Sequence, residues 1–239
     1  MASLVDALPD VVALQCLARV PLSQHPTMQQ VCKAWRSTMR SSELFQLRKA
    51  LGTQECWLYV CTHCPDKIWQ AYDPLGDKWF VLPQLPSSIL GLSRFKSVGY
   101  EGKLYVMGGG SDYVNLSGDR DGPAATNEAW VFDPVSRRWS SIAPMLTPRA
   151  HFACMVYEGQ IVVAGGFDSS EKPIFTAEVY NPHVDVWQPF ASLKEWSLAN
   201  QISTGVVLEG KMRVIHMVER MTQVYDPKTK RCVDSLLFS

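Results

Sequence analysis

Four stretches of the chain share one pattern, and that pattern decides the fold: WQAYDPLGDKW (69–79), WVFDPVSRRW (130–139), EVYNPHVDVW (178–187) and QVYDPKTKRC (223–232). In each stretch an aromatic residue is followed by Asp or Asn and then by Pro. Trp79, Trp139 and Trp187 each stand six residues after that Asp or Asn, and Cys232 takes the same place in the fourth stretch. The four stretches are therefore copies of one structural unit.

A second element recurs upstream of three of these stretches: YEGKLYVMGG (100–109), YEGQIVVAGG (157–166) and LEGKMRVIHM (208–217). Short apolar runs alternate with turn residues through the whole region, which is typical of β-strands joined by tight hairpins. The repeat lengths, measured from Asp133 to Asn181 to Asp226, are 48 and 45 residues. That period predicts one four-stranded blade of a β-propeller for each copy.

The recurring residues have structural explanations. Glu-Gly pairs stand between two strands, where Gly can supply the positive φ of a hairpin, and paired glycines end an inner strand, where neighbouring backbones can approach closely. Asp-Pro or Asn-Pro opens the next turn, and the following Trp is expected to pack between adjacent blades. The glycines do not precede a helix, which argues against a phosphate-binding loop. We expect these residues to hold the repeat together: Gly108, Gly109, Asp133, Trp139, Gly165, Gly166, Asn181 and Trp187.

Residues 1–52 have a helical period instead. We expect three short helices: one starting at Pro9-Asp10, a second after Pro26 that includes Met28, Cys32, Trp35 and Met39, and a third from Glu43 to Leu51. Gly52 is expected to cap the end of the third helix. Three helices of this length make a small core, so such a module usually leaves an apolar face for a partner. The sequence therefore predicts two domains, a helical module at 1–52 and a β-propeller at 53–239.

The second region resembles the kelch repeat family over about 180 residues. Paired glycines, the aromatic-Asp/Asn-Pro turn and the spaced Trp occur together in two complete copies, Gly108 to Trp139 and Gly165 to Trp187. The first copy lacks the double glycine, and the fourth has His216-Met217 where Gly-Gly is expected. The resemblance implies a mainly β fold, a kelch-type propeller of about four blades. Kelch propellers usually have six or seven blades, so the sequence leaves open whether this one closes or is an open, incomplete array.

The first region resembles an F-box in the order and spacing of its residues: Leu8-Pro9, Val12, Leu14, Leu17, Val20-Pro21, Val31 to Arg36, and Leu44. The resemblance implies that this module docks onto the Skp-type adaptor of a cullin–RING ubiquitin ligase. The residues expected to form or support the adaptor surface are Leu8, Pro9, Leu14, Leu17, Val31, Trp35 and Leu44. A helical cap folded onto the propeller is the alternative interpretation of the same residues.

An F-box followed by kelch repeats is similar to the plant F-box/kelch-repeat family. This resemblance implies a non-catalytic substrate receptor of an SCF-type E3 ligase, which would bring an unknown target protein to ubiquitination and proteasomal degradation. Target contacts are expected in the loops of one propeller face, because recognition residues concentrate in such loops. The candidates are Arg94, Tyr113, Arg120, Arg149 and Phe167. Arg149 also has a structural alternative, in which it pairs with backbone carbonyls or with an acid of the neighbouring blade.

Two other classes of function remain as alternatives. The first is a kelch scaffold without a ligase role, and the second is a metal-dependent propeller enzyme. Cys61-Thr-His-Cys64 has the spacing of half a zinc site, but no second Cys/His pair follows at a suitable distance, and alternation in CWLYVCTHC favours a strand. No nucleophile elbow or P-loop is present. We therefore expect no metal, no cofactor and no catalytic residue.

The composition excludes several classes of partner and location. The chain of 239 residues has 23 Lys+Arg and 23 Asp+Glu, so it has no net field that would attract nucleic acid or an anionic membrane. No apolar run approaches the roughly 18 residues of a membrane helix, and the N-terminus lacks a basic region of a signal peptide. The seven cysteines do not have the spacing of a disulfide scaffold. We expect a cytoplasmic or nuclear protein that binds other proteins.

Overall fold

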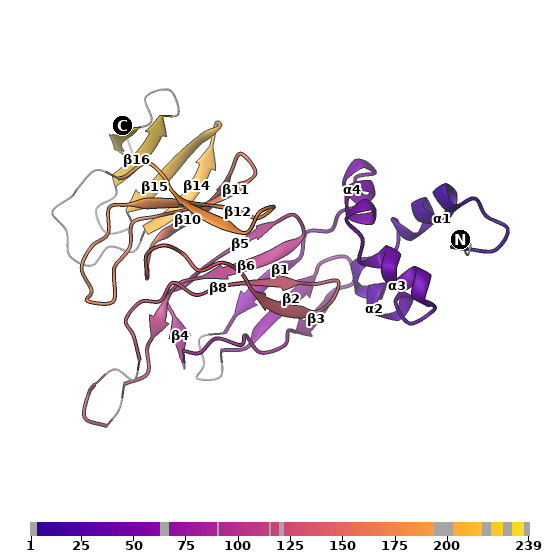
Figure 1. Ribbon diagram of the computed structural model, residues 1–239, viewed down its shortest axis with the longest axis horizontal. Helices are drawn as coiled ribbons and strands as arrows, with labels where there is room; N and C mark the ends of the chain where they lie inside the picture. The colour runs from indigo at the N-terminus through magenta and orange to yellow at the C-terminus, as the bar shows by residue number, and fades with distance from the viewer. Residues whose placement is uncertain are drawn as a thin grey trace. The chain divides into compact units, whose positions relative to one another are not determined.

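The computed structural model describes residues 4–62, 67–89, 91–114, 116–119, 122–193, 203–216, 221–226 and 231–236 (Figure 1). The chain divides into two compact units. The first comprises Met1–Leu85 and the short segment Asp133–Arg138, and the second comprises Pro86–Phe132 and Trp139–Ser239. Along the chain, the change from helix to strand falls between Ala50 and Leu58.

The first unit begins with short helices: α1 (Asp10–Leu17), the 3-10 turn η1 (Leu22–Gln24), α2 (His25–Met28), α3 (Lys33–Met39) and α4 (Ser42–Ala50). The single helix expected after Pro26 is wrong, because the chain forms two helices there. Cys32 is extended, with φ −158° and ψ 172°, and its sulfur accepts the backbone N–H of Trp35 at 3.4 Å. An extended residue that caps the following helix ends the α2 segment and starts α3.

A small core holds these helices together. It consists of four residues buried against one another, Leu17, Ala18, Met39 and Leu44.

Helix α4 is capped as predicted by Gly52, which has φ +66°. The backbone N–H of Gly52 donates to the carbonyl of Lys49, and the N–H of Thr53 donates to the carbonyl of Arg48. These two backbone bonds form the glycine-dependent C-terminal cap known as a Schellman motif.

A buried ion pair joins the helices to the segment that follows them. Arg48 donates to the carbonyl oxygens of Ala18, Val20 and Thr53 and lies 3.1 Å from Glu55 Oε1. The side chain of Gln29 donates to the carbonyl of Val135 at 2.8 Å, in the short segment 133–138 of the same unit. The helical module therefore does not rely on its apolar core alone.

The first unit also contains blade 1, a three-stranded antiparallel sheet of β1 (Leu58–Cys61), β2 (Trp69–Asp73) and β3 (Lys78–Val81).

Two-residue hairpins recur in the other blades, where Glu101-Gly102, Glu158-Gly159 and Glu209-Gly210 all have positive φ. Two successive residues with positive φ define the type I′ turn, which matches the twist of the flanking strands.

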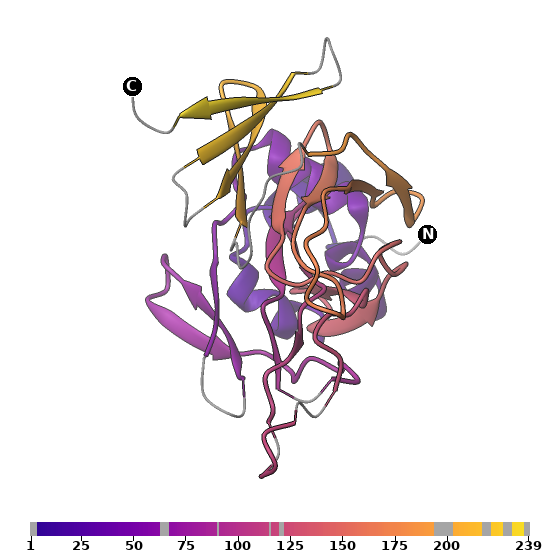
Figure 2. The ribbon, with the colours of Figure 1, turned by 90° about the vertical axis from the view of Figure 1, so that its left-hand side faces the viewer.

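Three four-stranded antiparallel sheets follow. Blade 2 consists of β5 (Lys96–Tyr100), β6 (Lys103–Met107), β8 (Ala129–Asp133) and β9 (Arg138–Ser141), with the short pair β4 (Leu92–Ser93) and β7 (Gly110–Ser111) beside it. Blade 3 consists of β10 (Ala153–Tyr157), β11 (Gln160–Ala164), β12 (Ala177–Asn181) and β13 (Val186–Pro189). Blade 4 consists of β14 (Ser203–Leu208), β15 (Lys211–His216), β16 (Met221–Asp226) and β17 (Arg231–Leu236). In Figure 2 the strands of this last sheet are drawn in gold and yellow.

Successive blades of the second unit pack face to face through apolar clusters. Strand β10 lies against β5 on one side and β14 on the other. The cluster between blades 2 and 3 contains Tyr105, Met107, Ile161, Tyr180 and Trp187. The cluster between blades 3 and 4 contains Met155, Val162, Met212, Tyr225 and Cys232. A mainly β fold of stacked kelch-type blades is therefore confirmed.

The paired glycines permit close contact between neighbouring backbone segments, as predicted. Gly109 has φ +87°, and a Cβ atom on it would lie 2.3 Å from the carbonyl oxygen of Ser93. Gly166 has φ +92°, and its Cβ would lie 2.5 Å from the carbonyl oxygen of Ala150. Any side chain at either position would displace the neighbouring backbone.

Arg149 ties blade 3 together beside Gly165. Its side chain has no exposed surface and donates to the carbonyls of Gly165 and Thr176 and to Glu178 Oε1, the last at 2.7 Å. Burial lowers the pKa of Arg149, and the adjacent Glu178 carboxylate opposes that effect. Glu178 also accepts the backbone N–H groups of Leu146 and Thr147. The structural alternative for Arg149 is therefore the correct one.

The repeat tryptophans differ in burial. Trp187 is 5% exposed and donates its indole N–H to the carbonyl of Ala143 at 2.7 Å, whereas Trp79 is 54% exposed. The expectation that each Trp packs between blades is confirmed for Trp187 and is wrong for Trp79.

The Trp187→Ala variant is expected to lose roughly 3–5 kcal/mol of unfolding free energy, because it removes a large buried side chain. The matched variant Trp79→Ala is expected to lose less than about 1 kcal/mol, since its ring is more than half exposed. Urea unfolding of both variants measures the difference. Equal losses would contradict the assignment of Trp187 as the buried contact of the pair.

The Glu178→Gln variant is expected to lose about 3–5 kcal/mol, because it leaves the Arg149 guanidinium buried without its counter-charge. The control is Glu209→Gln, whose side chain is exposed and lies 3.5 Å from Arg213; it should change stability by less than about 0.5 kcal/mol. Thermal unfolding monitored by circular dichroism compares them. Similar stability of the two variants would show that the buried pair is dispensable.

Candidate functional site

Aliphatic side chains lie exposed on the helical module. We define the N-terminal apolar surface as Leu8, Pro9, Val11, Val12 and Val31, all of which are exposed, Val11 at 70%. Leu8 and Pro9 precede α1, Val11 and Val12 lie in its first turn, and Val31 lies between α2 and α3. Exposed apolar groups on so small a module are candidates for a contact with another protein.

The other expected adaptor residues support this surface from within. Leu17 and Leu44 are buried in the helical core, and Leu14 and Trp35 are half-buried against it. The Trp35 indole N–H donates to the carbonyl of Leu4 at 2.6 Å, which holds the chain before α1 against α3. The structure thus divides the predicted set into exposed and supporting members.

Val11 and Val12 extend the exposed set beyond the sites predicted from the sequence. Four apolar residues, Val11 to Leu14, follow one another at the start of α1, and a helix cannot turn four successive side chains toward one core. Ala13 is buried, while Val11 and Val12 are exposed. The run of apolar residues was the signal that could have identified them.

The interior of the module contains one histidine. His25 is buried and its Nε2 atom lies 3.3 Å from the carbonyl of Val20. Burial, and then the positive charge of Arg48, lower the pKa of His25. The imidazole is therefore neutral near pH 7 and adds no charge beneath the N-terminal apolar surface.

A second candidate site lies in the loops of blades 2 and 3. We define the loop cluster as Arg94, Asp112, His151, Phe167 and Glu171. Arg94 Nε lies 3.1 Å from Asp112 Oδ1, and Arg94 Nη1 lies 3.8 Å from Glu171 Oε1. The His151 N–H donates to the carbonyl of Arg94, and the His151 ring meets that of Phe167 edge-on at 6.4 Å. The structure therefore brings Arg94 and Phe167 together.

Charges within the loop cluster largely offset one another. The Arg94 side chain is 18% exposed and stands between two more exposed carboxylates. Burial lowers the pKa of His151, and the positive charges of Arg94 and Lys96 lower it further. With a neutral His151, the one arginine and two carboxylates give the cluster a formal charge of −1, together with hydrogen-bonding groups and an aromatic edge.

An exposed apolar loop follows Asp112. Tyr113, Val114 and Leu116 are all more than half exposed. The backbone N–H of Tyr113 donates to Ser111 Oγ, which positions the start of the loop. Val114 and Leu116 were not predicted as contacts, since single apolar residues in a loop carry no distinctive pattern. Arg120 lies outside the described residues.

Arg149 is not a contact residue for a target, which corrects the expectation from the sequence. Its side chain is fully buried, and its two terminal nitrogens donate to the backbone and side chains of blade 3. A side chain without exposed surface cannot touch a ligand on the propeller face.

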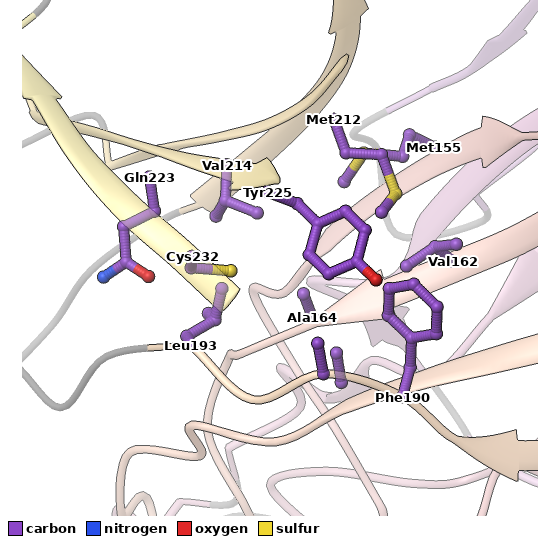
Figure 3. Close-up of a pocket in the computed structure, with 12 residues that line it drawn as sticks. Met155, Val162, Ala164, Phe190, Leu193, Met212, Val214, Gln223, Tyr225 and Cys232 are labelled. Atoms are coloured by element: carbon purple, nitrogen blue, oxygen red, sulfur yellow. The ribbon is translucent and has the colours of Figure 1, made fainter. Parts of the chain in front are cut away.

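A cavity between blades 3 and 4 offers little room. It measures about 20 Å³, and its lining is almost wholly apolar, with Met155, Phe190, Met212 and Tyr225 prominent (Figure 3). A volume of this size holds about one water molecule, which makes the cavity a packing gap between blades and not a ligand site.

In the described part of the chain, no three His, Cys, Asp or Glu residues lie close enough together to hold a metal ion. Burial raises the pKa of Cys61. His63 and Cys64 of the candidate zinc half-site lie outside the described residues.

Among the described helices, none is long and apolar enough to cross a membrane.

Comparison with known proteins matches both regions to families. An F-box domain model matches residues 5–47, and a Kelch motif model matches residues 91–146 and 148–194. The solved structure titled "Structure of YjhT" superposes with a TM-score of 0.53 at 15% identity, covering 70% of this chain and 58% of that one. A likeness at this identity supports the fold alone.

Two curated relatives from Arabidopsis thaliana align with most of this chain. The F-box/kelch-repeat protein SKIP30 is 46% identical over 227 residues, which cover 95% of this chain and 64% of SKIP30. The F-box protein AFR is 30% identical over 193 residues, covering 77% of this chain and 48% of AFR. The chain thus spans between about half and two thirds of these relatives. With an F-box at its N-terminus and kelch motifs after it, the chain belongs to the F-box/kelch-repeat family of plant proteins.

Proposed function

We propose that the protein is a substrate-receptor subunit of an SCF-type cullin–RING ubiquitin ligase. Its F-box binds the Skp-type adaptor, and its kelch blades bind a target protein that the ligase marks for proteasomal degradation. The observation that carries the proposal is the N-terminal apolar surface, which lies within the segment that matches the F-box model. The protein itself catalyses nothing in this proposal.

The physical basis of adaptor binding is burial of aliphatic side chains. Each large one is worth roughly 1.5–3 kcal/mol when it leaves water completely. A few such anchors supply a substantial part of the roughly 8 kcal/mol that corresponds to micromolar affinity, before the entropic cost of association is subtracted. Leu8, Val11 and Val31 are well suited to this role, since they are exposed on a module whose core is already complete.

The receptor acts by raising the effective concentration of its target near the ligase. The loop cluster and the exposed loop at Tyr113 are the proposed target contacts. We propose the cytoplasm or the nucleus as the compartment, because the cysteine spacing is not that of a secreted disulfide scaffold.

The double variant Leu8→Ala, Pro9→Ala is expected to lose at least about 90% of co-purification with a co-expressed Skp-type adaptor, since it removes exposed contacts and no core residue. The variant Val31→Ala should also reduce co-purification with the adaptor, because it changes a second position of the N-terminal apolar surface. The matched control is Val184→Ala, an exposed aliphatic in a turn of blade 3. Circular dichroism verifies that all variants stay folded.

Undiminished co-purification of the double variant would contradict adaptor binding through this surface and would favour the kelch scaffold without a ligase role.

Target binding is tested separately by affinity purification under proteasome inhibition. Arg94→Glu and Phe167→Ala should lose proteins that the wild type retains, while adaptor binding is unchanged. Retention of every such protein by both variants would contradict the loop cluster as the target contact.

A further inference from the structure

The five residues that join the helical module to blade 1 are themselves part of the packed structure. We call residues 53–57, between α4 and β1, the linker. Its burial alternates: Thr53, Glu55 and Trp57 are partly buried, whereas Gln54 and Cys56 are exposed. An extended chain shows this period of two when one of its faces lies against the protein. The docked linker thus differs from a flexible coil, in which the two ends move independently.

Glu55 lies at the centre of the linker and accepts three hydrogen bonds. Its side chain is only 5% exposed. Oε1 accepts the backbone N–H of Leu22 at 2.8 Å and the Arg48 guanidinium at 3.1 Å, and Oε2 accepts the indole N–H of Trp57 at 2.9 Å. A carboxylate suits this place because both of its oxygens accept, whereas a glutamine amide would turn N–H groups toward one of the donors. Glu55 therefore joins the start of η1, helix α4 and the end of the linker.

On the helical side, the linker is held by the core of the module. Arg48, which pairs with Glu55, also donates to the carbonyls of Ala18 and Val20. The Thr53 hydroxyl donates to the same Ala18 carbonyl at 2.9 Å, and Ala18 has no exposed surface. A turn of the linker relative to the helices would break these bonds and leave buried polar groups without partners, which is costly.

On the blade side, Trp57 extends the contact to the sheet. Its ring stacks on that of Phe80 in β3, with centroids 5.2 Å apart and planes at 8°. The indole is therefore fixed at two places, by its N–H on Glu55 and by its face on blade 1. A continuous set of contacts runs from the helical core through Glu55 and Trp57 to β3.

A second tie joins the helices to blade 1 at a different point. Gln29 is 6% exposed, and its side-chain nitrogen donates to the carbonyl of Val135, in the turn that follows β8 and belongs to the same compact unit. In that turn, Arg137 donates to the carbonyl of Val81 in β3 at 3.3 Å. Two ties at separate points prevent the rotation that a single tie would allow.

We propose that Glu55 is a positioning residue, which holds the helical module and its N-terminal apolar surface in one orientation on blade 1. The importance of this role rests on the proposed function, in which the module binds the adaptor and the kelch region binds the target. A stiff connection limits the positions that blade 1 takes around a bound adaptor, whereas a flexible one spreads them and lowers the effective concentration at any one place. Glu55 itself touches neither the adaptor nor the target.

Distances between two spin labels, measured by double electron–electron resonance on the full chain, test this role. Labels carried by unnatural amino acids at Ser37 of α3 and Leu75 of blade 1, both exposed, leave the native cysteines unchanged. The wild type is expected to give one narrow distance distribution. Trp57→Ala removes the stacked ring and the N–H donor but keeps the pair of Arg48 and Glu55, and it should broaden the distribution at least about twofold.

The matched control is Gln54→Ala, which changes an exposed residue of the same linker and should leave the width of the distribution unchanged. Glu55→Ala should broaden it as Trp57→Ala does, but it also destabilises the module, because it leaves Arg48 buried without its counter-charge. Trp57→Ala therefore decides the question. If these contacts contributed only to stability, Trp57→Ala would lower the unfolding temperature without changing the width in the folded protein.

A broad distribution in the wild type would overturn the proposal, as would an unchanged width in Trp57→Ala that circular dichroism shows to be folded. Equal broadening by Gln54→Ala would also contradict it, since any change in the linker would then have the same effect. The distance measurement needs no adaptor, so its outcome is independent of the co-purification that tests the proposed function. The adaptor affinity of Trp57→Ala should equal that of the wild type, and weaker binding would contradict a role in positioning alone.

Discussion

The apolar contact between the facing sheets of successive blades organises the second unit. A blade of four short strands cannot bury both of its faces by itself, so its stability depends on the neighbour that covers it. Tyr180 and Trp187 supply the apolar area of that contact between blades 2 and 3, and their hydrogen bonds to Asp185 and Ala143 set its register. The remaining features of the repeat serve to bring these two surfaces together.

The glycines and Arg149 act within the blades, where backbone segments lie close together. Gly109 and Gly166 allow strands of adjacent segments to approach closer than any side chain would permit. Arg149 occupies the space beside them and satisfies carbonyls of Gly165 and Thr176 that have left water. The loops proposed to contact a target start beside these buried contacts, at the loop cluster of Arg94 and Phe167.

Much of this architecture could be predicted from the sequence, because the repeat encodes both strand periodicity and turn chemistry. The close approach at the paired glycines and the cap at Gly52 followed from local backbone requirements. The burial of the repeat tryptophans could not be predicted in this way, since Trp79 and Trp187 occupy the same motif position but differ in what covers them. The role of Arg149 was equally hidden, because an arginine in a loop has the same sequence pattern whether it faces solvent or a buried acid. For the F-box, periodicity identified Leu17 and Leu44 but could not divide core from exposed positions where apolar residues are consecutive, as at Val11 and Val12.

We propose that the N-terminal apolar surface of the helical module, and not the kelch loops, binds the Skp-type adaptor. Hydrogen exchange measured by mass spectrometry on the full chain, with and without the adaptor, tests it directly. We expect slower exchange in peptides spanning residues 8–12 and 29–33, and unchanged exchange in peptides containing Arg94, Tyr113 and Phe167. Protection confined to the kelch loops, or no protection in the helical module, would contradict it.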